Sequence, residues 1–205
     1  MHQILSVPRY ARYLQRAEGD TRLAIGLYQW NLELAAGFYH LLHWIEVGLR
    51  NAMHRQLQHH FERADWWEVA PLDANGHNKI RRARAQLDRR KRGLGTPDDL
   101  VTELTFGFWV SLLSRGRAYD RMLWVPALHR AFPRYAGPRR DLHAELYAVL
   151  HFRNRIMHYE PVFDLNLAAY RETIYRVLGY LSSHVVDLVA DLDRIPDALG
   201  RPPRG

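Results

Sequence analysis

Apolar side chains recur at steps of three and four residues over one stretch of this chain that is far longer than an average helix. The stretch begins near Thr21 and continues to about Phe61. Because an α-helix turns once every 3.6 residues, this spacing gathers the apolar positions along one stripe and predicts a single long helix, kinked at Gly37. The stripe consists of Leu27, Trp30, Leu34, Phe38, Leu41, Ile45, Leu49 and Ala52.

A short helix is expected before the long one. Ser6-Val7-Pro8 is a typical helix start, and this first helix should stop around Gly19. Asp20 is then the predicted N-cap of the long helix, because a carboxylate accepts hydrogen bonds from the free amide groups of a first turn.

The middle of the chain contains several start and stop patterns. A helix over 78–92 is expected to break at the Gly-Leu-Gly segment 93–95. Positions 96–99, Thr-Pro-Asp-Asp, provide an N-cap, a proline at the first helical position and an acidic first turn. The apolar segment 100–114 predicts a buried helix, and 117–132 predicts one or two short helices.

Two more helices are expected towards the C-terminus. One spans about Arg139 to Tyr159, and a last helix fills most of 166–193. The core-facing positions of the first are Leu142, Leu146, Val149, Leu150 and Ile156 or Met157. No segment alternates like a strand, and the chain has neither an internal repeat nor a glycine-rich phosphate loop. The predicted fold class is therefore all-α, a helical bundle with long core helices and an inserted region of short helices.

Length and composition fit one globular domain. The chain has 205 residues, of which 47% are hydrophobic and 25% charged. We expect a lead-in helix over 1–19, a single helical domain over 20–195 and a flexible tail over 196–205.

Net charge and missing residue types narrow the function. The formal net charge of +7 favours a polyanionic partner, either a nucleic acid such as RNA or an anionic membrane surface. The absence of cysteine excludes disulfides, thiol catalysis and Cys-ligated zinc. No apolar run of about eighteen residues and no signal-peptide pattern occur, so we expect no membrane partner and a cytoplasmic location.

The segment from His151 to Pro161 carries the clearest chemistry, since it places Arg153 and Asn154 shortly before His158. Cleaving a phosphodiester without a metal requires a cation that holds the phosphate, and a group that moves the 2′-hydroxyl or leaving-group proton near neutral pH. Arginine offers a planar fork that matches phosphate oxygens, and histidine has an ordinary pKa near physiological pH.

Helical spacing constrains this motif. Asn154 and His158 are four residues apart and share a face, whereas Arg153 lies about 140° around the helix from His158. Arg153 must therefore reach around, or the helix must loosen. Because Glu160 precedes Pro161, the helix should end close by, with His158 in its last turn. The alternative is that the arginines are surface residues and His158 merely caps a helix end.

The string from Leu150 to Pro161 resembles the R-N-x-x-x-H signature of HEPN domains, specifically that of the Abi-like (abortive infection, AbiD/AbiF type) proteins of bacteria. Four further blocks look like that family's in the same order, and the resemblance covers roughly positions 20 to 185. These blocks are 28–34, 45–52, 65–67 and 101–109.

The resemblance implies an all-helical HEPN-like bundle, a homodimer with the motif helices at its interface, and a metal-independent endoribonuclease without a cofactor. In this hypothesis His158 is the general base or acid, Arg153 holds the scissile phosphate, and Asn154 orients one of them. A role as a toxin or in phage defence follows by family analogy, and an antitoxin partner is left open. The alternatives are a non-catalytic RNA-binding or regulatory HEPN module and a nucleotide-sensing or partner-binding subunit.

A dense group of cations precedes the glycine break, where Asp88 is the only acid. Each phosphate that such side chains neutralise releases counterions, so we expect them to bind RNA. The alternative is a solvated helix face. The group consists of Lys79, Arg81, Arg82, Arg84, Arg89, Arg90, Lys91 and Arg92.

The long helix has a related pair of polar residues. Glu46 and Arg50 are spaced for a helical ion pair, and Arg50-Asn51 echoes Arg153-Asn154. Glu46, Arg50 and Asn51 either line or orient the site, or form a structural network between two core helices.

Histidines and aromatic residues elsewhere are assigned structural roles. The histidines His40, His43, His54, His59 and His60 show no H-E-x-x-H pattern, so no metal site is predicted. Trp66, Trp67, Phe106, Phe108 and Trp109 could stack on unpaired bases, but core packing is favoured. Within that group Trp66 and Trp67 are expected to be the exposed pair, because Asp65 and Glu68 flank them.

Overall fold

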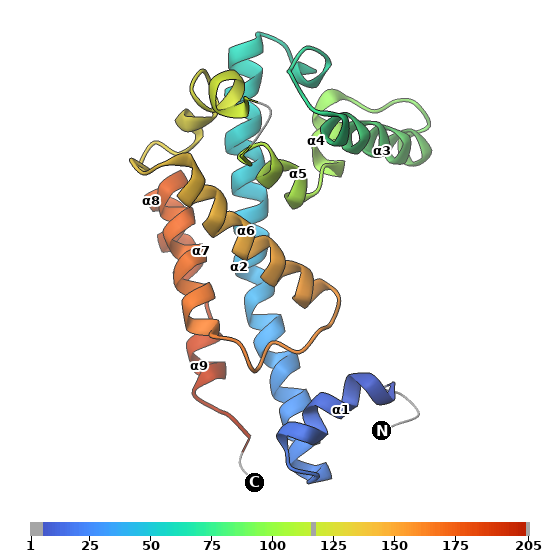
Figure 1. Cartoon of the computed structure of the whole chain (residues 1–205), viewed down its shortest axis with the longest axis vertical. Helices are drawn as coiled ribbons and strands as arrows, with labels where there is room; N and C mark the ends of the chain where they lie inside the picture. The colour runs from blue at the N-terminus through green and yellow to red at the C-terminus, as the bar shows by residue number, and fades with distance from the viewer. Residues whose placement is uncertain (1–5, 116–117, 204–205) are drawn as a thin grey trace.

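The computed structural model describes residues 6–115 and 118–203, and within these ranges the chain forms helices and no strand. The predicted all-α fold class is confirmed, and Figure 1 shows the arrangement. The α-helices are α1 Val7–Arg16, α2 Thr21–Phe61, α3 Ala74–Lys91, α4 Pro97–Glu103, α5 Phe106–Ser111, α6 Arg139–Met157, α7 Leu167–Leu181, α8 Ser183–Ala190 and α9 Ile195–Leu199. Three single-turn helices, η1 Trp66–Glu68, η2 Asp120–Trp124 and η3 Leu128–Ala131, lie in the connections.

Helix α2 is the spine of the molecule. It has 41 residues, so it extends for roughly 60 Å. The Asp20 carboxylate caps it as predicted, accepting hydrogen bonds from the backbone amides of Arg22 and Leu23 at 2.7 and 3.0 Å. From Leu34 to Leu49 the positions of the predicted stripe are fully buried, whereas Trp30 and Ala52 at its ends are partly buried. The predicted long helix is thus confirmed, with the expected bounds.

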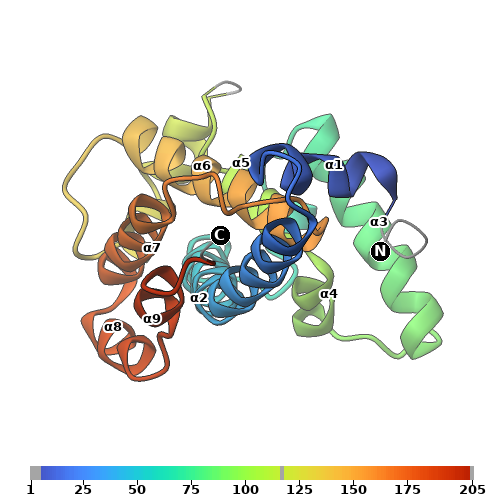
Figure 2. The same ribbon diagram turned by 90° about the horizontal axis from the view of Figure 1, so that it is seen from below.

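The other helices pack around this spine. Helix α6 crosses α2, α7 runs beside it, and α1 and α9 lie near its N-terminal end (Figures 1 and 2). One aromatic contact ties three helices together: Phe152 of α6 meets Phe38 of α2 edge-on at 4.7 Å between ring centroids and stacks on Tyr170 of α7 at 4.2 Å. This contact fixes the depth at which α6 sits.

Helix α2 remains one continuous helix through Gly37, where a kink was expected. Gly37 serves close packing instead, because an added Cβ would lie 3.2 Å from the Ile195 side chain of α9. The indole of Trp30 also donates a hydrogen bond to the Ala198 carbonyl, at 2.8 Å. For residues 196–203 the expectation of a flexible tail is therefore corrected: α9 is held on α2, and Pro203 lies against Gly26. The last two residues of the expected tail lie outside the described residues.

Two expected helices are interrupted. The buried segment 100–114 forms α4 and α5, separated by extended backbone at Leu104 and Thr105. The break lets Leu104 and Phe106 both enter the core. The last helix is likewise divided at extended Ser182, after which α8 folds back so that Val186 approaches Gly179 of α7. The spacing of apolar residues does not change at either break, because the chain remains amphipathic while it changes direction. The sequence pattern therefore predicted one continuous helix in each case.

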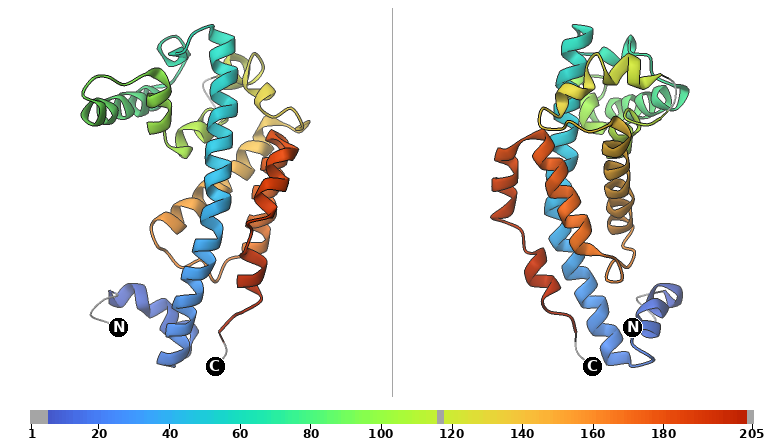
Figure 3. Two further views of the ribbon diagram at one scale, coloured as in Figure 1. Left: turned by 180° about the vertical axis from the view of Figure 1, so that it is seen from behind. Right: turned by 60° about the vertical axis from the view of Figure 1, so that its left-hand side comes forward.

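Helices α3 and α4 form an arm that projects from α2 (Figures 1 and 3). Helix α3 starts earlier than expected, since Asp73 caps it by accepting from the Gly76 amide. Thr96 caps α4 as predicted, and the Asp99 carboxylate accepts in return from the Thr96 amide, which makes a reciprocal capping box. The two helices are joined by buried Leu87 and Leu100, and by the ion pair between Arg90 and Glu103 at 2.7 Å.

The tryptophans after α2 hold the base of this arm. Trp66 and Trp67 are 0% and 3% exposed, so the expectation of an exposed pair is wrong. Their flanking acids point outward, where Asp65 pairs with Arg63 and Glu68 with Arg84. Trp66 also donates a hydrogen bond to Nδ1 of buried His54 at 3.0 Å, while Nε2 of that ring faces the Asp98 carboxylate at 3.5 Å.

We expect His54 to make the fold acid-sensitive. An indole nitrogen can only donate, so Nδ1 of His54 must carry no proton in the fold. Burial lowers the pKa of His54, partly opposed by Asp98. A lowered folded-state pKa means that its stabilising contribution is complete above the ordinary value of 6.5 and is lost as the pH falls through the folded-state value.

Urea denaturation from about pH 7.5 to pH 5 checks this expectation. The free energy of unfolding should decline with acid, and His54→Asn should show a smaller decline, because the amide oxygen accepts the Trp66 hydrogen bond without titrating. His143, whose pKa burial also lowers, is present in both proteins and cancels from the comparison. Equal declines in the two proteins would show that His54 does not cause the effect.

Candidate active site

The R-N-x-x-x-H motif occupies the C-terminal end of α6. The helix ends at Met157 and His158 is its C-cap, about two residues before the predicted end. Tyr159 adopts a left-handed conformation with φ of 57°, and the Glu160 amide donates back to the Arg155 carbonyl at 2.9 Å. This hydrogen bond closes the last turn and directs the chain away from the helix axis.

A buried asparagine of α2 holds the segment that follows the motif. Asn31 is 3% exposed, and its Oδ1 accepts hydrogen bonds from the amides of Val162 and Phe163 at 2.6 and 3.2 Å. Arg155 donates to the Pro161 carbonyl from the other side. The turn after α6 is therefore pinned to the spine by polar contacts that its sequence alone does not reveal.

The lead-in helix α1 contributes to the same turn. Arg12 pairs with Asp164 at 2.7 Å, and Arg9 donates to the backbone carbonyl of His158 at 3.3 Å. These contacts place α1 over the end of the motif, so it is part of the site's support.

Arg153 is paired with an acid of the spine. Its Nε donates to Oε2 of Glu46 at 3.3 Å, and both side chains are about a quarter exposed. Glu46 thus pairs between helices, instead of pairing along α2 with Arg50 as its spacing suggested. Arg50 lines a cavity of about 340 Å³ together with Glu46 and Arg153, while exposed Asn51 accepts a hydrogen bond from Arg50 and does not line it.

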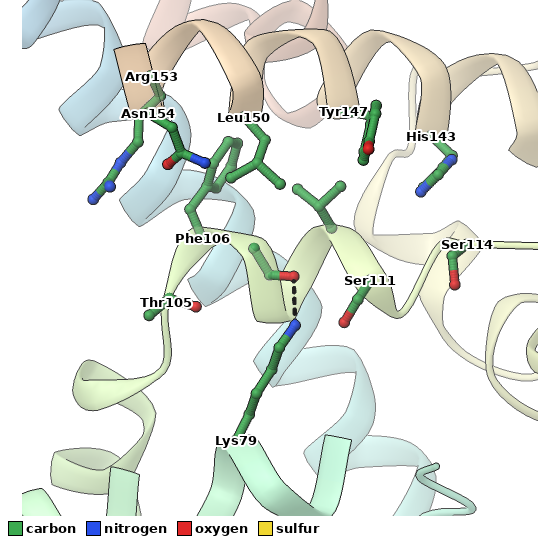
Figure 4. Close-up of a pocket in the computed structure, with 12 residues that line it drawn as sticks. Lys79, Thr105, Phe106, Ser111, Ser114, His143, Tyr147, Leu150, Arg153 and Asn154 are labelled. Atoms are coloured by element: carbon green, nitrogen blue, oxygen red, sulfur yellow. Dashed lines mark hydrogen bonds between the residues drawn. The ribbon is translucent and has the colours of Figure 1, made fainter. Parts of the chain in front are cut away.

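A second cavity, of about 560 Å³, lies between α5 and α6. We call it the α5–α6 cavity. In Figure 4, Arg153 and Asn154 lie at one end of it and His143 and Ser114 at the other, with Tyr147 and Leu150 between them. Its lining consists of Lys79, Thr105, Phe106, Gly107, Val110, Ser111, Ser114, His143, Tyr147, Leu150, Arg153 and Asn154.

One cation of the predicted basic group enters this cavity. Lys79 of α3 reaches across to donate to the Gly107 carbonyl at 3.2 Å, and burial lowers the pKa of its ammonium group. Burial also lowers the pKa of His143 at the far end, an effect that nearby Arg139 reinforces. The tertiary structure therefore brings Lys79, Arg153 and Asn154 to one cavity.

His158 occupies a different position from its partners. It is exposed, lines neither cavity, and within the described residues its side chain makes no hydrogen bond or ion pair. Its backbone amide donates to the Asn154 carbonyl at 2.9 Å, which places it one turn beyond Asn154. The imidazole is thus free to meet a ligand, but it does not touch Arg153 within this chain.

The rest of the basic group lies on the arm and is partly neutralised. Arg84, Arg90 and Lys91 form ion pairs with Glu68, Glu103 and Asp99, and Arg81 is hydrogen-bonded to Asn78. These acids lie outside 79–92, so charge counting along that segment overestimated the free positive charge. The cations that remain exposed with no ion pair among the described contacts are Arg81, Arg82, Arg89 and Arg92.

Sequence reasoning missed an aromatic strip on α6. His143, Tyr147 and His151 follow one another at steps of four residues. The Tyr147 ring centroid lies 5.8 Å from that of His143 and 4.4 Å from that of His151. Tyr147 is 50% exposed. The four-residue spacing of these rings on the motif helix is the signal in the sequence that indicates the strip.

Compared with known proteins, the chain matches no family model, no curated protein and no solved structure. Within the described residues, no three His, Asp or Glu side chains are grouped as a metal ion would require. No helix in the described part of the chain combines the length and apolar character needed to cross a bilayer.

Asn31 offers a test of how the motif turn is held. Asn31→Leu should lower the free energy of unfolding by about 1–3 kcal/mol, because the amides of Val162 and Phe163 lose their shared acceptor in a buried position. Chymotrypsin should also cut faster after Tyr159. The matched control is Asn51→Leu, an exposed asparagine on the same helix. Similar effects of the two substitutions would contradict the anchoring role.

Proposed function

We propose that this protein is a metal-independent endoribonuclease of the HEPN, Abi-like type that acts on RNA in the cytoplasm. The observation that carries the proposal is that Arg153 and Asn154 line cavities at the C-terminal end of α6, and exposed His158 follows Asn154 by one turn. Glu46 holds the Arg153 guanidinium in place, and about a quarter of the Arg153 side chain stays exposed to solvent.

The residues suit attack by the 2′-hydroxyl of RNA on its neighbouring phosphate. The 2′-oxygen forms a bond to phosphorus as the bond to the 5′-oxygen breaks, which leaves a 2′,3′-cyclic phosphate and a 5′-hydroxyl. His158 removes the proton from the 2′-hydroxyl or delivers one to the leaving oxygen. Arg153 binds the phosphate oxygens and offsets the charge that develops on them, and Asn154 orients one of these groups.

Charge supports an RNA substrate. Lys79 and Arg153 lie at the α5–α6 cavity. On the neighbouring arm, exposed positive charge remains at Arg81, Arg82, Arg89 and Arg92. A strand bound at the motif and running towards the arm would meet both groups. Affinity for RNA should therefore depend steeply on salt concentration.

A second copy of this chain would add a second motif to the site. Proton transfer at both oxygens calls for two groups. Besides His158, exposed His43 lines the Glu46 and Arg153 cavity, and a second copy would supply a further His158. An apolar surface patch lies next to the Glu46 and Arg153 cavity, and Tyr39 and Met157 belong to both. Pairing two copies through this patch would bring two motifs together and cover exposed apolar area. The patch consists of Leu32, Ala35, Ala36, Tyr39, Ile156, Met157 and Tyr159.

The pairing of Arg153 with Glu46 also favours a second candidate, a non-catalytic RNA-binding or regulatory module. A carboxylate on the guanidinium competes with a phosphate for its donors, and no contact joins Arg153 to the His158 side chain. In that case the motif would hold α6 on α2. A toxin or phage-defence role and an antitoxin partner belong to the first candidate, by family analogy.

RNA cleavage in excess EDTA separates the two candidates. Wild type should cut labelled single-stranded or transfer RNA to products with cyclic phosphate and 5′-hydroxyl ends, and His158→Ala should be slower by about 100-fold or more. His184→Ala, an exposed histidine on α8, is the matched control and should retain full activity. Wild-type protein that binds RNA and leaves it intact would favour the binding module.

Sedimentation equilibrium tests the second copy. Tyr39 is 59% exposed in the apolar patch, so Tyr39→Lys should weaken a wild-type dimer by about tenfold or more and lower cleavage in parallel. Val125→Lys, at 63% exposure outside the patch, should change neither property. A monomeric wild type with full activity would refute the shared site.

A further inference from the structure

The α5–α6 cavity has the chemistry of a nucleotide subsite. Arg153 and Asn154 lie at one end of the cavity, His143 lies at the other end, and Lys79 lies on one side. Between them, Phe106 and Leu150 form an apolar wall. No carboxylate is found among the described residues that line it. A ligand that fits such a lining is anionic at one end and flat and weakly polar along its body.

The position of Tyr147 gives the flat part of a ligand a place to bind. Its ring borders the cavity, is half exposed, and is held between His143 and His151, whose rings contact it on either side along α6. An aromatic ring supported in this way loses little side-chain freedom when a base stacks on it. Stacking on exposed aromatic side chains is how proteins bind unpaired bases.

Distances along the helix fit a single nucleotide. Tyr147 and Asn154 lie on the same face of α6, separated by seven residues and hence on the order of 10 Å along the axis. One nucleotide reaches about that far from its phosphate to the outer edge of its base. The cavity volume of about 560 Å³ is within the usual range for small-molecule sites.

We propose that the α5–α6 cavity binds one unpaired nucleotide, with its base on Tyr147 and its phosphate between Arg153 and Lys79. This rests on the proposed function in one respect, that the bound nucleotide belongs to the RNA substrate beside the scissile phosphate. The consequence is a preference for single-stranded RNA, since a paired base cannot leave its stack to enter the cavity. Ser111, which lies towards the Tyr147 end of the cavity in Figure 4, is placed to hydrogen-bond the edge of the base.

Two ligands share this chemistry, a base of an RNA strand and a free mononucleotide. Binding is measured by fluorescence anisotropy with a short oligoribonucleotide that carries 2′-O-methyl groups and is therefore not cut, and separately by titration with each of the four nucleoside 5′-monophosphates. Tyr147→Leu should weaken binding by roughly tenfold through loss of the stacked ring. Tyr147→Phe, the matched control, keeps the ring and should stay within about twofold of wild type.

Photocrosslinking of the wild-type protein provides a readout that needs no variant. The same oligonucleotide with 4-thiouridine at one position should crosslink to α6 near Tyr147 or to α5 near Phe106, as located by mass spectrometry. If Tyr147→Leu weakens the binding of the oligonucleotide alone, the cavity binds RNA. If it also weakens the binding of a mononucleotide, the cavity binds a free nucleotide. The proposal is overturned if Tyr147→Leu binds both the oligonucleotide and the mononucleotides as wild type does, and the crosslinks fall only on the arm.

The outcome is separable from that of the nuclease proposal. His158→Ala should leave nucleotide binding within about twofold of wild type, because His158 lies outside the cavity. If wild type binds in a Tyr147-dependent way but cuts no RNA, the subsite stands and the endoribonuclease does not. If His158-dependent cleavage occurs and Tyr147→Leu binds as wild type does, the nuclease stands and the subsite does not.

Discussion

The burial of one continuous apolar stripe along α2 is the constraint on which the rest of the structure depends. Phe38, Ile45 and Leu49 are completely shielded from water, and they are covered by helices that come from every later part of the chain. Burying side chains of this size stabilises by about 1.5–3 kcal/mol each. No other element has comparable length, so α6, α7 and α9 take their positions from it (Figure 2).

Polar contacts to the same spine then position the candidate site. Asn31 holds the turn after the motif, and Glu46 holds Arg153 about four turns further along α2. One rigid helix therefore fixes both the end of α6 and the orientation of its arginine. A site whose chemistry depends on distances of a few tenths of an ångström benefits from groups carried on rigid elements.

Acidic residues from distant segments pair with some of the basic side chains and leave the others free to bind a phosphate. Glu103 and Asp99 of α4 pair with Arg90 and Lys91, while Lys79 turns inward to the Gly107 carbonyl. Neutralisation on the arm and desolvation at the cavity divide one basic run into groups with different properties. The attraction between a phosphate and the exposed arginines is screened by solvent and salt. Lys79 is less hydrated, so its attraction for a phosphate is screened less.

The sequence by itself determined the local elements: the long helix from Thr21, its Asp20 cap, the Thr96 cap of α4 and the end of α6 near His158. Each depends on side chains within a few residues of the backbone they cap or bury, so spacing alone reveals it. Tertiary structure decided that Glu46 pairs with Arg153 across two helices, that Trp66 is buried, that the chain breaks at Leu104 and Ser182, and that Lys79 and Tyr147 share a cavity. These outcomes depend on which surfaces meet across long stretches of chain, or on where the chain must reverse direction. The sequence does not reveal them, because the amphipathic periodicity of a helix is the same whichever neighbour covers its apolar face.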